Sequence, residues 1–197
     1  MGMPDFLLRC SGHDGVEDFF IHITLMENNA RAEERTVIMS EQALVAAGVN
    51  SWKLNIERAN KLFSPLTEEQ LLKEVAPGKN RLIYLWGHLT AVHDRMLPLL
   101  VLGPRLHPEY DALFLTSPDK TVPTLPAAQE IKQAWEEVNG KLLAGFESLS
   151  PAAWLEKHDA VSAEDFAKDP RRNRFSLLLN RTTHISFHLG QTALISK

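Results

Sequence analysis

Apolar residues recur every three to four positions along four long stretches of the chain, a spacing that places them on one face of a helix. The first stretch stops at Ser64-Pro65, where proline disfavours a helical residue before it and removes a backbone donor. The pattern therefore predicts four long helices, at residues 40–63, 81–102, 126–149 and 175–196.

Shorter elements connect these helices. Thr67-Glu-Glu-Gln70 has the form of a capping box and predicts a short helix to about Val75. Asn80 is a suitable N-cap for the second long helix, and Pro98 is expected to kink or end that helix in its last turn. The other connections are a proline-studded crossover or lid at 103–125 with a short helix at 107–114, a short helix at 152–157, and a polar segment at 158–173.

The two halves of the chain share one order of elements: a long helix, Ser-Pro, a short helix, a loop, Asn-Arg, and a long helix that carries histidine. The matching pairs are Ser64-Pro65 with Ser150-Pro151, and Asn80-Arg81 with Asn173-Arg174. Such an echo is expected of a bundle built from two similar helix pairs. The chain is therefore predicted to be all-α, a four-helix bundle with short connecting helices, occupying residues 40–197.

Residues 1–38 differ in character and are interpreted as an N-terminal leader or appendage. The aromatic and β-branched run at residues 19–26 predicts a short strand, residues 28–35 a polar loop, and residues 36–39 a second short strand. An alternative is that Met39 marks the start of the functional domain. The leader is assigned no chemistry, and its Cys10, His13 and His22 are treated as incidental.

Composition narrows the function classes. At 197 residues, with 44% hydrophobic and 23% charged residues, the chain is typical of one globular domain. A net charge of −4 argues against non-specific electrostatic binding to nucleic acid. One cysteine excludes an internal disulfide and fits a reducing cytoplasmic setting. No apolar run approaches the roughly 20 residues of a membrane span, so no membrane partner is expected.

Three histidines are candidates for a metal site. His184 and His188 lie four residues apart, so their rings share one face of the last helix. His88 lies in the middle of the apolar stripe of the second helix. A bare pair at this spacing is often two ordinary histidines, but three inward imidazoles would need three separate partners to avoid the cost of burial. One metal ion would serve all three, and three protein ligands leave a position open for water or substrate.

The residues that carry this pattern resemble a known family. Trp86-Gly-His88-Leu-Thr-Ala-Val-His-Asp94, followed by His184-Ile-Ser-Phe-His188-Leu-Gly-Gln191, is similar to the DinB-like (damage-inducible) metalloprotein superfamily over residues 40–197. The resemblance implies an up-down-down-up bundle in which His88, His184 and His188 bind one divalent ion, and it implies a homodimer. It also implies a small electrophilic substrate and a low-molecular-weight thiol as cosubstrate, because members include thiol-dependent S-transferases and isomerases.

Two chemistries and one non-catalytic role follow. The open position could activate water for hydrolysis or a thiol for transfer, or the ion could only tie helices together in a stress protein. Imidazole ligands suit Zn or Ni, and also Fe or Cu. Asn180, Arg181 and Gln191 are weaker candidates that could orient a ligand or meet substrate. His93 lies about 140° from His88 around the helix and is not expected to be a ligand.

Overall fold

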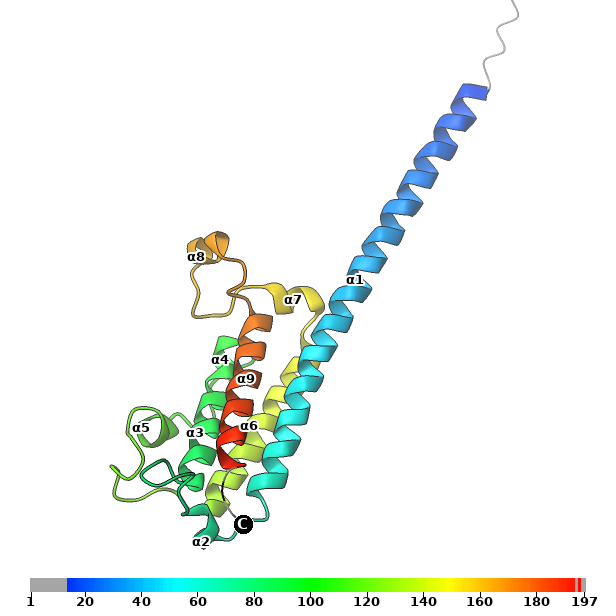
Figure 1. The fold of residues 1–197 in the computed structure, drawn as a ribbon. Coiled ribbons are helices and arrows are strands. Elements are labelled where there is room, and N and C mark those ends of the chain that lie inside the picture. Colours follow the sequence, from blue (N-terminus) through cyan, green and yellow to red (C-terminus); the bar gives the residue numbers. More distant parts are fainter. Residues whose placement is uncertain (1–13, 194, 196–197) are drawn as a thin grey trace, which may run out of the picture. The chain divides into compact units, whose positions relative to one another are not determined.

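The computed structural model describes residues 14–193 and 195, and its regular elements are all helical (Figure 1). Their bounds are α1 Asp14–Phe63, α2 Glu68–Leu71, α3 Leu82–Asp94, α4 Met96–Leu99, α5 Tyr110–Phe114, α6 Ala128–Ser148, α7 Pro151–Leu155, α8 Ala163–Lys168 and α9 Arg174–Thr192. Because the described residues form no strand, the all-α prediction is confirmed. No helix in these ranges combines the length and the apolar character that a membrane crossing needs.

The strands expected at residues 19–26 and 36–39, and the loop between them, are wrong. The helix α1 is continuous from Asp14 to Phe63 through all three segments. The apolar–polar alternation of the run covers only residues 21–25, and neither glycine nor proline interrupts the chain between Gly15 and Gly48. A helix bonds its own backbone, whereas a strand needs a neighbour, so the unbroken segment stays helical. Cys10 and His13 lie outside the described residues.

The chain divides into two compact units, residues 1–43 and 44–197. In the second unit, the C-terminal part of α1 packs beside α3, α6 and α9 (Figure 1). Figure 1 shows α3 and α6 running from the end where α2 lies to the end where α7 lies, and α9 running the opposite way. Close approach of α1 to α9 depends on Gly48, because a Cβ there would lie 2.5 Å from the Phe175 ring.

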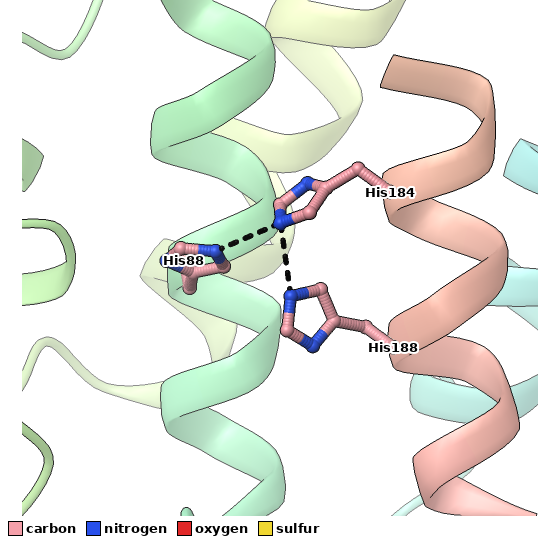
Figure 2. A group of neighbouring side chains, drawn as sticks. All are labelled: His88, His184 and His188. Atoms are coloured by element: carbon pink, nitrogen blue, oxygen red, sulfur yellow. Dashed lines mark hydrogen bonds between the residues drawn. The ribbon is translucent and has the colours of Figure 1, made fainter. Parts of the chain in front are cut away.

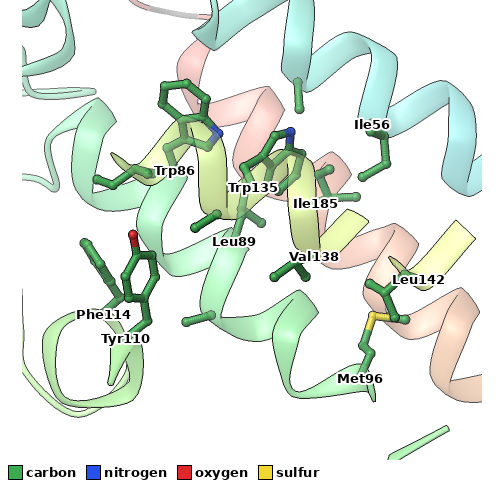
Figure 3. Packing of buried hydrophobic residues seen from close by; sticks show 14 of the residues in the cluster. Ile56, Trp86, Leu89, Met96, Tyr110, Phe114, Trp135, Val138, Leu142 and Ile185 are labelled. Atoms are coloured by element: carbon green, nitrogen blue, oxygen red, sulfur yellow. The ribbon is translucent and has the colours of Figure 1, made fainter. Parts of the chain in front are cut away.

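The helix stripes expected from the sequence meet in one core (Figure 3). Trp52 and Ile56 of α1, which belong to these stripes, are buried in it, as are Leu89 of α3 and Ile185 of α9, which lie outside the expected stripes. The share of α6 consists of Ile131, Ala134, Trp135, Val138, Leu142 and Phe146. Because every layer of the bundle contributes large apolar side chains, the helices that carry histidine are held firmly against one another.

The second long helix is shorter than expected. It ends at Asp94, and α4 follows from Met96 to Leu99, so residues 81–102 contain two helices. Pro98 lies in the last turn of α4, and Val101 just beyond has φ of 61°. The N-cap is Arg81, not Asn80, and the Arg81 backbone N–H donates to Asp119 Oδ2 at 2.7 Å. A distant carboxylate in the crossover therefore takes the place of a local cap.

The order of elements that the two halves share in the sequence is also found in the structure. Isolated antiparallel bridges pair Glu74 with Arg81 and Lys157 with Asn173, just before α3 and α9 begin. In both halves a short helix thus leads back through one bridge into a long helix that carries histidine. The first bridge uses the second residue of Asn80-Arg81, whereas the second bridge uses the first residue of Asn173-Arg174, so the two halves match with an offset of one residue. The second connection, 158–173, also contains α8, which its polar sequence concealed.

Candidate metal centre

Three imidazoles from two helices converge on one point (Figure 2). His88 lies on α3, and His184 and His188 lie one turn apart on α9. His184 Nε2 is 3.3 Å from His88 Nε2 and 3.0 Å from His188 Nε2. The three ligand atoms lie within 4.8 Å of one another, so the group could hold a metal ion. The structure thus brings together the three histidines selected from the sequence.

Local structure fixes the direction of the α9 pair. Asn173 caps the helix by accepting a hydrogen bond from the Ser176 backbone N–H at 2.8 Å. Leu178 and Ile185 are fully buried on the flank of the histidine face, about 60° to 120° around the helix from the two rings. With one stripe packed in the core, the i,i+4 spacing places both rings toward α3.

Oxygen acceptors hold two of the rings in one tautomer. His88 Nδ1–H donates to the Phe114 carbonyl oxygen at 2.9 Å, and His188 Nδ1–H donates to Gln191 Oε1 at 2.8 Å. Each of these rings therefore presents the lone pair of Nε2 toward the shared centre. Metal-bound histidines characteristically donate their other ring N–H in this way, which favours a metal at this place.

The Phe114 contact depends on a glycine in α3. A Cβ at Gly87 would lie 2.3 Å from atoms of the Phe114 ring, which is itself fully buried. Gly87 therefore lets α5 approach α3 closely enough for the Phe114 carbonyl to reach His88. The long crossover is thus part of the site. Sequence reasoning missed this, because a backbone acceptor leaves no residue-type signal.

The charges around the centre favour neutral imidazoles. Burial lowers the pKa of His88 and of His188, against the opposing effect of their hydrogen bonds to Phe114 and Gln191. Burial, followed by the charges of His188 and His88, lowers the pKa of His184 to about 4. Neutral rings whose lone pairs face one another repel at 3.0 Å unless a proton or cation lies between them. A divalent cation fits this donor set, because all three rings can coordinate it at once.

The structure places the weaker candidates for the site in different surroundings. Gln191 contacts the centre through His188, whereas Asn180 is exposed on α9. Arg181 is half-buried, and its Nε has no hydrogen-bond partner among the described residues. His93 is fully buried but does not belong to the cluster; its ring lies 4.4 Å from that of Trp52 and 5.0 Å from that of Trp135.

A carboxylate network anchors the crossover beside the site. Asp94, fully buried at the end of α3, accepts from the Leu106 and His107 backbone N–H groups at 2.8 and 3.0 Å. Arg105 bridges Asp94 to Asp111 of the crossover, at 3.0 and 2.6 Å. This network fixes the start of the segment that later supplies the Phe114 carbonyl. In the sequence, Asp94 was the last residue of the family-like motif and was assigned no role.

The comparison with protein families agrees with this geometry. A family model described as the DinB superfamily matches residues 51–192, which is most of the chain. The chain belongs to the DinB superfamily. The match contains α3 and α9, and therefore all three histidines of this DinB-like centre. A search of curated proteins found no match.

Proposed function

We propose that this DinB-superfamily protein is a metal-dependent enzyme, a thiol S-transferase or a hydrolase acting on a small electrophilic substrate. The supporting observation is that three Nε2 atoms converge while no fourth His, Cys, Asp or Glu joins the group within the described residues. Catalytic zinc sites use three protein ligands and keep one position for water or substrate, whereas structural sites use four.

His88, His184 and His188 would hold one divalent ion, Zn or Ni in our proposal, with Fe or Cu as alternatives. Such an ion, when bound, lowers the pKa of a coordinated water or thiol and so supplies the nucleophile. The chain itself keeps the ligands neutral by burial and orients them through Phe114 and Gln191. A low-molecular-weight thiol as cosubstrate is what the family resemblance favours.

A second role, in which the ion is structural and nothing turns over, is favoured by one observation. His88 belongs to α3 and the other two histidines to α9, so a bound ion would cross-link two helices. The two roles differ in what the metal-loaded protein does. An enzyme accelerates the reaction of a small thiol with an electrophile such as monobromobimane, or the hydrolysis of an activated ester, and loses this in His188→Ala. A structural site leaves the rates of both reactions unchanged.

Metal analysis of the purified protein tests the site directly. Wild type is expected to contain about one equivalent of a divalent ion, and His88→Ala, His184→Ala and His188→Ala should each contain almost none. His107→Ala is the matched control, because His107 is half-buried and, among the described residues, its ring hydrogen-bonds only Glu109 and Glu137. Equal metal content in all five proteins would overturn the proposal.

A further inference from the structure

Arg181 differs from every other half-buried arginine in the described part of the chain. The other three have carboxylate partners: Arg81 with Asp119 at 2.7 Å, Arg105 with Asp111 at 2.6 Å, and Arg174 with Glu156 at 3.2 Å. No carboxylate lies within ion-pair distance of Arg181 among the residues described. Arg181 Nε is buried without a partner among the described residues, and an unsatisfied buried donor favours an acceptor supplied by a ligand.

The groups that face Arg181 do not supply that anion. Burial lowers the pKa of Arg181, and the nearby Arg95 charge lowers it further. Arg95 is already paired with Asp111 at 2.5 Å. The Arg181 charge also lowers the pKa of four histidines, His88, His93, His158 and His184. The surroundings of Arg181 are therefore neutral or positive.

Three histidines that feel the Arg181 charge each have a buried ring nitrogen without a partner among the described residues. These atoms are His93 Nε2, His158 Nδ1 and His184 Nδ1, and Arg181 Nε shares this property. Figure 2 shows His184 Nδ1 turned toward the N-terminal side of α9, away from His188, and Arg181 precedes His184 on that side. When His184 Nε2 faces the metal centre, its proton resides on Nδ1, so both side chains carry an N–H donor without a partner among the described residues.

We propose that Arg181, assisted by His184 Nδ1–H, binds the oxyanion of a substrate or thiol cosubstrate, most simply a carboxylate, beside the three-histidine centre. This inference rests on the proposed function, because the other end of the same ligand, the thiol, is taken to bind the metal. Residues three apart are neighbours on a helix surface, so Arg181 and His184 lie beside one another on α9. A small molecule with two or three carbons between carboxylate and thiol is the ligand that we expect to span Arg181 and the metal.

The test compares matched small ligands on cobalt-loaded protein. Binding of 3-mercaptopropionate and of neutral 2-mercaptoethanol is followed by the sulfur-to-cobalt charge-transfer band. Wild type is expected to bind the carboxylate-bearing thiol at least about tenfold more tightly, because a charged hydrogen-bonded pair is gained. Arg181→Gln should reduce that preference to about one while its cobalt content stays at the wild-type level. Arg174→Gln, which removes a paired arginine of the same helix, should keep the preference.

A second pair of ligands separates the two proposals. The carboxylate 3-hydroxypropionate and the neutral ethylene glycol are titrated calorimetrically into the protein, and neither contains a thiol. If thiols give no charge-transfer band but 3-hydroxypropionate binds in an Arg181-dependent way, the result supports the anion site and contradicts the proposed thiol chemistry. If neither ligand pair shows a carboxylate preference in wild type, or if Arg181→Gln keeps it, the anion site is overturned.

Discussion

His93 and the three-histidine centre are two ways of burying imidazole, and α3 contributes to both. His93 is completely enclosed by Trp52 and Trp135, and its Nδ1–H donates to Asn139 Oδ1 at 2.8 Å. Its Nε2 has no partner among the described residues. His88, five residues earlier, has a carbonyl acceptor on Nδ1 and directs Nε2 at two other histidines.

The difference shows that burial alone does not identify a metal ligand. Burial lowers the pKa of both side chains, so both rings are kept neutral. What distinguishes His88 is the convergence of Nε2 atoms together with an oxygen acceptor behind the ring. His93 has an acceptor behind its ring but no convergent partners, so its role is to fill the core. The following predictions test this distinction, from the largest expected effect to the smallest.

Acidification should act most strongly through His93. Its pKa is about 3 in the folded protein against 6.5 ordinarily, so the unfolded chain binds more protons between these values. The stabilising contribution is full above the ordinary pKa and is lost as pH falls toward the folded one. We expect up to about 1.4 kcal/mol of unfolding free energy to be lost per pH unit in that window.

Urea unfolding of chelator-treated protein at about pH 7 and about pH 5 measures this loss. A His93→Gln variant should lose less free energy between the two conditions, because its buried side chain cannot be protonated. Identical losses in the two proteins would contradict the assignment. The other histidines titrate in both proteins and therefore cancel in the difference.

Metal should stabilise the three-histidine centre and not the His93 pocket. A divalent ion at a hundred times its dissociation constant raises the unfolding free energy by about 2.7 kcal/mol if it binds only the folded state. Thermal unfolding with and without zinc should show this shift in wild type and in His93→Gln, and its absence in His188→Ala. A metal-induced shift in His188→Ala equal to that of wild type would place the ion elsewhere.

The smallest effect concerns the hydrogen bond behind a ligand. Gln191→Leu removes the acceptor that orients His188, at 2.8 Å from Nδ1, but keeps the three imidazoles. Metal affinity should fall by about tenfold to a hundredfold. Competition with a metal-sensitive dye measures it, and Asn180→Ala, an exposed change on the same helix, should match wild type. A Gln191→Leu affinity equal to wild type would show that this hydrogen bond does not tune the site.

The sequence predicted the helical skeleton well because its signals are local. The stripes that include Trp52, Trp135 and Leu142 recur at helical spacing, and these residues are buried in the core. Prediction failed for residues 19–26, where residue type suggested a strand although no turn signal bounded it. It also failed at Asn80, because the cap of α3 is supplied by Asp119, 38 residues from Arg81.

For the candidate site, the sequence by itself determined that His184 and His188 share a helix face and that His88 lies on another apolar stripe. These properties follow from the 3.6-residue period of the helix. Only the tertiary structure decided that the Nε2 atoms meet within 4.8 Å, that the Phe114 carbonyl reaches His88, and that Arg181 lacks a carboxylate partner among the described residues. Each of these depends on packing between segments far apart in the chain, which local periodicity does not encode.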